Sequence, residues 1–295
     1  MVAFEVPEID YTRYTNRQLA AVPLAVLAIA LLIIAGWYVA TGVPVNPGLD
    51  FTGGAEIRVA VDGPSDQARA QIEQAFDPAP ETVRSVPNPN ADSTTYILTF
   101  QTETVGVSAL EEQARAAGFE VESSYTVSPS FGSRTQTLAL GGVAFAFFGM
   151  SALVFLLFRT FVPSIAVVIS AFSDVVVPVA LMNLLGIELT LGTVAALLML
   201  IGYSVDSDIL LNNHILRRSG GFYESTHRAM RTGVTMTLTS LSAMVVMTIV
   251  ATLFGIQLLA AIGTVLVFGL ATDLMNTYML NLSLLRWYKY EGVSN

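Results

Sequence analysis

Six apolar segments, each about 20 residues long, constrain the fold of this chain more than any other feature. They span residues 19–40, 138–158, 162–185, 189–210, 234–254 and 258–282. A segment of this length crosses the ~30 Å hydrocarbon layer of a bilayer as a helix. Only 13% of the residues are charged, against about 25% in an ordinary soluble domain. The sequence therefore predicts an integral membrane protein with six membrane-spanning helices.

Basic residues predict the side of the membrane that each loop occupies, because cytoplasmic loops are enriched in Lys and Arg. With a cytoplasmic N-terminus, nine of the 14 basic residues lie on the cytoplasmic side, and the other five lie in the one large loop. We therefore predict a multi-pass protein of the cell membrane with both termini cytoplasmic. The predicted order is a cytoplasmic N-terminus (1–18), a first helix (19–41), an exterior domain (42–135), five helices (136–286) with a cytoplasmic loop (212–231), and a cytoplasmic C-terminus (287–295). The first segment is too long for a signal-peptide core and lacks a small-x-small cleavage site, so we expect it to be retained.

The large loop has the composition of a small folded domain. Residues 56–63, 82–86, 94–102 and 120–127 have the pattern of strands, and residues 65–76 and 107–119 have the period of helices. Ser108 and Glu111 have the spacing of a capping box at the start of the second helix. The order β-α-β-β-α-β predicts a ferredoxin-like α+β fold. That fold has many functions, and this loop shows no pattern of catalytic residues.

The charge balance of the chain is acidic. Acidic residues outnumber basic ones by 23 to 14, and 13 of the basic residues are arginine. Acid-rich, lysine-poor surfaces are typical of proteins that work at high salt, where charge repulsion is screened. GC-rich codon usage is the alternative explanation. The chain has no cysteine, which excludes disulfides and thiolate metal sites. No motif indicates a metal, a cofactor, a nucleic-acid partner or an enzyme active site.

Four aspartates within the predicted spans are the candidate functional residues: Asp174, Asp206, Asp208 and Asp273. An ionisable side chain at mid-membrane costs at least ~2.5 kcal/mol and usually lines an interface or a pathway. An ion or proton relay is one interpretation, and hydrogen bonds that hold the helices together are the other. Asp206 and Asp208 are about 200° apart around a helix, so they face opposite ways. Arg231 could pair with a carboxylate of the fourth span or extend to the cytoplasmic surface.

Two sequence motifs occur in this framework. GLDFTGG follows the first span and contains Gly48, Asp50, Phe51, Gly53 and Gly54, and GYSVDSD in the fourth span contains Gly202, Tyr203 and Ser204. The pair Ser173 and Asp174 in the third span and the segment RTGVTMTLTSL in the fifth accompany them. With six spans and one large loop, these motifs resemble the SecF branch of the SecD/SecF protein-export family, in its archaeal form. That family is related to the resistance-nodulation-division transporters.

The fourth-span motif departs from the bacterial pattern of the family. That pattern reads GYSxND, which places its aspartate at Ser207, whereas the acids here are Asp206 and Asp208. The carboxylate that would act as the relay residue therefore stays open between them.

The resemblance implies that the six spans form one half of a resistance-nodulation-division type bundle, with a SecD homologue as the other half. It implies a function in Sec-dependent protein export, driven by a proton or sodium gradient. The implied partners are SecD, the Sec translocon channel, the exported polypeptide and membrane lipid. A related small-molecule permease and a passive scaffold without ion coupling are the alternatives. The resemblance implies neither an enzymatic activity nor a cofactor.

Overall fold

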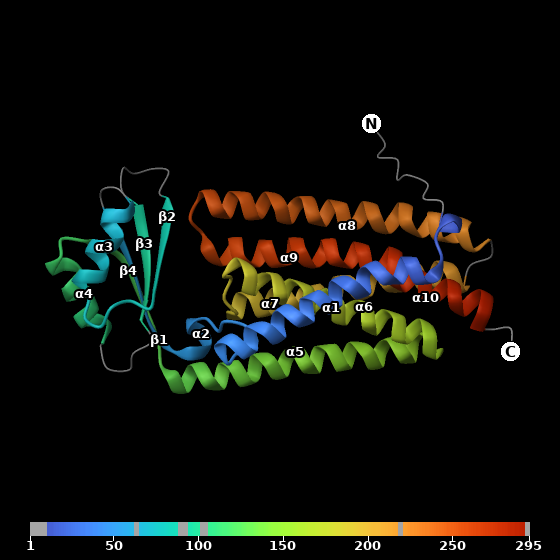
Figure 1. The fold of residues 1–295 in the computed structure, drawn as a ribbon, viewed down its shortest axis with the longest axis horizontal. Coiled ribbons are helices and arrows are strands. Elements are labelled where there is room, and N and C mark those ends of the chain that lie inside the picture. The colour runs from blue at the N-terminus through green and yellow to red at the C-terminus, as the bar shows by residue number, and fades with distance from the viewer. Residues whose placement is uncertain (1–10, 62–64, 88–93, 101–105, 218–220, 293–295) are drawn as a thin grey trace.

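A long helical bundle carries a small α+β domain at one end (Figure 1). The computed structural model describes residues 11–61, 65–87, 94–100, 106–217 and 221–292. The described residues contain six helices that are long and apolar enough to cross a membrane, which confirms the predicted number. The spans are α1 (Asn16–Thr41), α5 (Pro129–Phe158), α6 (Phe161–Leu185), α7 (Leu191–Arg217), α8 (Phe222–Leu253) and α9 (Gln257–Met275). The short helix η1 (Tyr11–Arg13) precedes α1, and the π-helix η2 (Asn276–Asn281), α10 (Leu282–Trp287) and the π-helix η3 (Tyr288–Gly292) continue the last span.

The spans differ in how far they are buried within the chain. Helices α6 and α7 are the most buried, whereas α5 and α8 are covered least. The exposed face of α5 is apolar, with Phe145 82%, Phe148 70% and Leu156 74% exposed. A face of this composition is suited to contact with lipid chains. The centre of the bundle is therefore formed by α6 and α7, packed against α9.

Two helices extend further than the apolar pattern predicted. The segment 129–135, assigned above to the exterior domain, forms the first turns of α5, because Ser128 caps the helix and Pro129 occupies its first position. In the segment 212–231, predicted as a cytoplasmic loop, α7 continues to Arg217 and α8 starts at Phe222. Polar residues mark the end of an apolar segment in the sequence, but the helix can continue through them.

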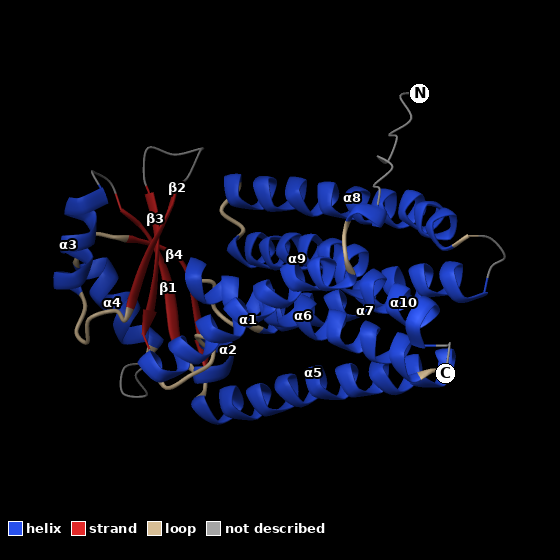
Figure 2. Cartoon of the chain, turned by 45° about the vertical axis from the view of Figure 1, so that its right-hand side comes forward, coloured by secondary structure: helices blue, strands red, loops and turns tan. Residues whose placement is uncertain are grey.

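The domain between α1 and α5, here called the loop domain, contains one four-stranded sheet. Its strands are β1 (Gly54–Val61), β2 (Thr82–Pro87), β3 (Thr94–Phe100) and β4 (Glu120–Val127), and its helices are α3 (Ser65–Ala75) and α4 (Val107–Ala116). The strand order is β2-β3-β1-β4 and every pairing is antiparallel, which confirms the ferredoxin-like topology. Both helices lie on one face of the sheet, and the other face is turned toward the bundle (Figure 2).

The hydrophobic core of the loop domain lies between the sheet and its two helices. Ile57, Leu98 and Phe100 from the strands pack against Ile72 of α3 and Leu110 of α4, and all five are at most 1% exposed. Burial of aliphatic and aromatic side chains of this size stabilises a fold by about 1.5–3 kcal/mol each. The alternation of these residues with polar ones is the period-two pattern from which the strands were predicted.

The predicted capping box of α4 is wrong. The helix starts after Gly106, and no side chain caps it. Glu111 instead pairs with Arg115 at 3.1 Å and accepts a hydrogen bond from Ser124 Oγ of β4 at 2.7 Å. A partner on the same helix and one on the sheet therefore replace the backbone amide that the spacing had suggested.

Candidate functional site: a buried carboxylate network

Three of the four candidate aspartates are buried inside the bundle. Asp174 of α6, Asp208 of α7 and Asp273 of α9 are each at most 2% exposed. Asp206 is exposed on the opposite face of α7, in line with its two-residue separation from Asp208. The structure therefore brings three carboxylates from three helices into the interior and leaves the fourth on the surface.

Asp174 connects α6 with two other helices. Ser204 Oγ of α7 donates to Asp174 Oδ2 at 2.5 Å, and Asn276 Nδ2 of η2 donates to Asp174 Oδ1 at 2.6 Å. Hydrogen bonds to a carboxylate are short and strong, particularly away from water. Ser204, a residue of the fourth-span motif, thus has a direct role in orienting Asp174.

Asp208 and Asp273 share a donor. Thr277 Oγ1 lies 2.9 Å from Asp208 Oδ1 and 3.3 Å from Asp273 Oδ1. Its single hydroxyl proton can be donated to only one of them at a time. Asn281 Nδ2 also donates to Asp208 Oδ1 at 2.8 Å, and Ser207 Oγ donates to Asp273 Oδ1 at 2.8 Å. The shared hydroxyl allows the hydrogen bonding of the two carboxylates to change together.

The donors of the last span come from a π-helix. Asn276, Thr277 and Asn281 all belong to η2, where the helix widens directly after Asp273. In an α-helix, residues five apart lie about 140° apart around the axis, so Asn276 and Asn281 would face different ways. The i→i+5 bonding of a π-helix moves such residues toward one face, and π-helical turns occur frequently at functional sites. The local widening therefore turns both amides toward the carboxylates.

The three aspartates of the network carry negative charge when they are ionised. In the described part of the chain, no basic side chain forms an ion pair with Asp174, Asp208 or Asp273. Like charges in surroundings of low dielectric constant repel one another strongly, so protons or bound cations must reduce the charge of this group. Among the described residues, several buried oxygens of the same helices have no hydrogen-bond partner: Asp208 Oδ2, Ser170 Oγ, Ser173 Oγ, Asn276 Oδ1 and Asn281 Oδ1. The described residues form no group of His, Cys, Asp and Glu with the arrangement of a metal site.

The remaining predicted residues lie outside this network. Arg231 is exposed on α8 and makes no ion pair within the residues that the structure describes. Gly202 and Tyr203 are exposed on α7 beside Asp206. The donors Ser207, Asn276, Thr277 and Asn281 are not among the sequence-predicted candidates. The available signal for the last three is their polarity within NTYMLN, one turn after Asp273.

The GLDFTGG motif lies where the loop domain joins the bundle. Gly48 N–H donates to Leu189 O at 2.8 Å, in the turn between α6 and α7. Asp50, in the short helix α2 (Leu49–Thr52), accepts the N–H of Leu191, the first residue of α7, at 3.0 Å on its Oδ2. A carboxylate at a helix N-terminus satisfies a free amide and interacts favourably with the helix dipole. The motif therefore fixes the start of the helix that carries Ser204 and Asp208.

Replacement of Asp50 by alanine is expected to destabilise this junction by about 1 kcal/mol, because the N–H of Leu191 loses its acceptor. Thermal unfolding of the purified chain measures the change. Glu112→Ala is the matched control, since Glu112 is exposed on α4 and makes no contact with the bundle. Equal unfolding temperatures for the two variants would show that the hydrogen bond contributes nothing.

Comparisons with known proteins agree with the motifs. The family described as "Protein export membrane protein SecD/SecF, C-terminal" matches residues 107–291, and "SecD/SecF GG Motif" matches residues 39–65. The protein-export membrane proteins SecF of Haloferax volcanii and Haloquadratum walsbyi are 72% and 69% identical to the chain, and the alignments cover 100% of each chain. Both organisms are halophilic archaea, in agreement with the acidic composition.

A solved structure has the same fold. The crystal structure of SecDF, a translocon-associated membrane protein from Thermus thermophilus, superimposes with a TM-score of 0.72 at 21% identity. The match covers 98% of this chain and 39% of the SecDF chain. The chain therefore has the fold of the matched part of SecDF, which is the resistance-nodulation-division type of fold that the sequence predicts. On the strength of its two family matches and its close full-length relatives, the chain belongs to the SecD/SecF family of protein-export membrane proteins, within its SecF branch.

Proposed function

We propose that this chain is the SecF half of an ion-driven export motor in the cell membrane. In this proposal, protons or sodium ions pass the network of Asp174, Asp208 and Asp273, and the resulting change in hydrogen bonding moves the loop domain. The observation that carries the proposal is the burial of three carboxylates with no cation paired to them among the described residues. Such a group is costly in a membrane protein unless it binds or transfers a cation.

The energy available from an ion gradient is sufficient for such a motor. One elementary charge that crosses 100 mV releases about 2.3 kcal/mol. Since about 1.4 kcal/mol changes an equilibrium constant tenfold, one ion can shift a two-state equilibrium by well over tenfold. The shared donor Thr277 provides a local two-state element, because its hydroxyl can bond to Asp208 or to Asp273.

A second protein is expected to cover the surface formed by α7 and α8. Asp206 and Tyr203 are exposed on α7, and Arg231, Thr235 and Thr239 are exposed on α8. Thr235 and Thr239 donate to backbone carbonyls of their own helix, but lipid chains cannot satisfy the exposed carboxylate of Asp206. The apolar face of α5 described above is suited to lipid instead. We therefore assign the α7–α8 surface to a SecD homologue, which would complete the double bundle.

The remaining parts of the proposal follow from the family. The Sec channel and the exported polypeptide are the expected partners of the loop domain, which would lie outside the membrane. The termini would be cytoplasmic, because most basic residues outside the loop domain lie near the opposite end of the bundle. The chain would have no catalytic activity of its own.

Neutralisation of Asp174 tests the proposal. In cells whose only copy of the gene carries Asp174→Asn, Sec-dependent secretion of a reporter is measured with and without an ionophore that collapses the ion gradients. Wild-type secretion is expected to fall with the ionophore, and secretion by the variant is expected to be low and insensitive to it. Glu112→Gln is the control for an exposed acid. A variant that keeps both the rate and the ionophore response would reject the motor.

The hydrogen bonds of the network also favour a passive scaffold, because they tie α6, α7 and η2 together. That alternative predicts that the Asp174→Asn chain fails to accumulate in the membrane or to bind its partner. Normal accumulation with lost gradient-dependent secretion separates the motor from the scaffold.

A further inference from the structure

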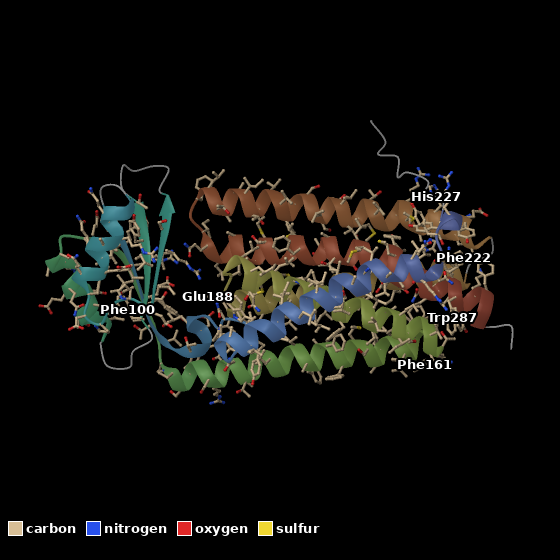
Figure 3. All side chains as sticks on the ribbon, viewed as in Figure 1. Phe100, Phe161, Glu188, Phe222, His227 and Trp287 are labelled. Carbon is tan, nitrogen blue, oxygen red and sulfur yellow. The ribbon has the colours of Figure 1, made fainter. Side chains whose placement is uncertain are left out.

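The loop domain contacts the bundle at two places of very different character. At one side, β1 and β4 continue into α2 and α5, next to the GLDFTGG motif. At the other side, Arg84 of the edge strand β2 reaches the turn between α6 and α7. Its Nη2 lies 2.5 Å from Glu188 Oε1 and donates to Gly186 O at 3.2 Å. Figure 3 shows Glu188 at the boundary between the two parts.

The contact at the motif is tight. A Cβ on Gly53 would lie 2.6 Å from Pro129 Cα, and a Cβ on Gly132 of α5 would lie 2.8 Å from Phe51 O. These neighbours are backbone atoms, which cannot move aside as a flexible side chain can. Asp50 adds the hydrogen bond to Leu191 N–H at the start of α7. This side cannot separate without loss of close backbone packing.

The contact at Arg84 is weak. The side chains of Arg84 and Glu188 are 42% and 25% exposed, and ion pairs with this exposure contribute little to stability. Burial raises the pKa of Glu188 above its ordinary value; Arg84 opposes this, while Glu56 and Glu81 add to the increase. Removal of Glu188 from water thus opposes the attraction of Arg84. Little free energy is needed to separate this pair.

A cleft of about 580 Å³ lies between the open face of the sheet and the bundle. Glu56, Arg58 and Tyr125 line it from the sheet, and Gln257 and Leu258 line it from the start of α9. Arg58 pairs with Glu56 at 3.2 Å, so these two charges satisfy each other within the domain, and Arg84 and Glu188 line the same cleft. Because the sheet is not packed against the bundle over this area, a change in its tilt would not open a hydrophobic core.

We propose that the Arg84–Glu188 pair is a releasable latch and that the GLDFTGG segment is the hinge about which the loop domain turns during export. The inference rests on the proposed function, in which the domain moves. Asp50 would act as a positioning residue, since it connects the hinge to α7. Ser204 lies 13 residues after Leu191, the first residue of α7, and is about 20 Å from it along the axis of the helix. A shift of α7 at the carboxylate network would therefore reach the hinge through one rigid helix.

The absence of cysteine from the chain allows a clean test. The double variant R84C/E188C is produced in the full chain in cells that lack the wild-type gene, and a reducible bis-methanethiosulfonate reagent links the two thiols. We expect the linked protein to lose Sec-dependent export by at least roughly tenfold, and a reductant to restore it. R69C/E73C is the matched control, because Arg69 and Glu73 form an equivalent pair within α3 at 3.3 Å and do not touch the bundle.

Each outcome decides the proposal. Export that continues with the two cysteines linked would overturn the proposal. The loop domain would then not need to separate from the turn between α6 and α7. Failure of the two thiols to link, while each single variant reacts, would also overturn it. The linking rate with and without an ionophore separates this proposal from the motor. If linking stops export but its rate does not depend on the gradient, the latch stands and the ion-driven mechanism fails.

Discussion

Asp208→Asn is expected to remove gradient-driven export while the chain still assembles with its partner. Asp208 is fully buried, and its Oδ1 accepts from Thr277 and Asn281, while its Oδ2 has no hydrogen-bond partner among the residues that the structure describes. Asparagine keeps the size of the side chain and one acceptor, but it cannot take up and release a proton or neutralise a cation. Secretion should fall by at least roughly tenfold, because each coupled charge is worth about 2.3 kcal/mol per 100 mV.

Asp206→Asn is the matched comparison, since it changes the same side chain two residues away on the opposite face of α7. Asp206 is exposed, and we place it at the surface that the SecD homologue covers. A carboxylate buried in an interface needs a partner group, and removal of one member of such a pair typically costs about 2–5 kcal/mol of binding. We therefore expect co-purification of the partner to decrease for this variant and to remain unchanged for Asp208→Asn.

The two variants are thus distinguished by co-purification of the partner, which is expected to decrease only for Asp206→Asn. If Asp206→Asn keeps the partner but loses gradient dependence, the relay lies on the exposed face, and the buried network is structural. If the Asp208→Asn chain no longer co-purifies with the partner, the hydrogen bonds of the native Asp208 to η2 are needed for assembly. The choice between these two acids, which the fourth-span motif leaves open, is settled by this pair of experiments.

The architecture was predictable because each element carries its own periodic signal. Six apolar segments predict six spans wherever they lie, and the alternation of Ile57 and Val59 with polar residues identifies β1 without knowledge of its neighbours. Helix ends were less predictable, because α5 and α8 extend beyond their apolar segments with polar turns. The side of α7 on which each acid lies also follows from local geometry alone.

The carboxylate network was predictable only in part. The pattern selects Asp174, Asp208 and Asp273 as unusual residues in membrane spans, but their common partners come from other helices. Asn281 illustrates the reason: on α-helical geometry it faces away from Asn276, and only the π-helix η2 brings both toward the aspartates. Contacts between helices distant in the sequence, and a local departure from regular helix geometry, cannot be read from the period of one segment.

Gly53→Ala is expected to lower the free energy of unfolding by about 2–5 kcal/mol, the largest effect on stability among the substitutions considered. Gly53 has φ +75° and ψ 171°, a conformation that is almost exclusive to glycine. In addition, an alanine Cβ would lie 2.6 Å from Pro129 Cα. The motif thus requires glycine here for two separate reasons, backbone conformation and space.

Three other glycines separate these two contributions. Gly42 has φ +80° and ψ −3°, the left-handed helical region, with nothing within 4 Å of its Cβ position, so Gly42→Ala gives a lower bound of about 1–2 kcal/mol for the conformational part alone. Gly132 lies within a helix but faces Phe51 O at 2.8 Å, so Gly132→Ala measures the lack of space, expected at about 1–3 kcal/mol. Gly141 lies in α5 with nothing within 4 Å, and Gly141→Ala should stabilise the helix by about 0.5–1 kcal/mol.

The fluorescence of Trp37 reports on this region during thermal unfolding, because its indole N–H donates to Asn46 Oδ1 at 3.1 Å, beside the hinge. The second tryptophan, Trp287, is removed by a Trp287→Phe background. If Gly53→Ala and Gly42→Ala lower the free energy of unfolding equally, Pro129 moves aside without an energetic cost and the hinge is loosely packed. The decrease in the free energy of unfolding for Gly53→Ala is also compared with the sum of the decreases for Gly42→Ala and Gly132→Ala. If it approaches that sum, the backbone at the motif is packed as closely as the structure shows. The loop domain must then move by rotation about the motif rather than by separation from the bundle.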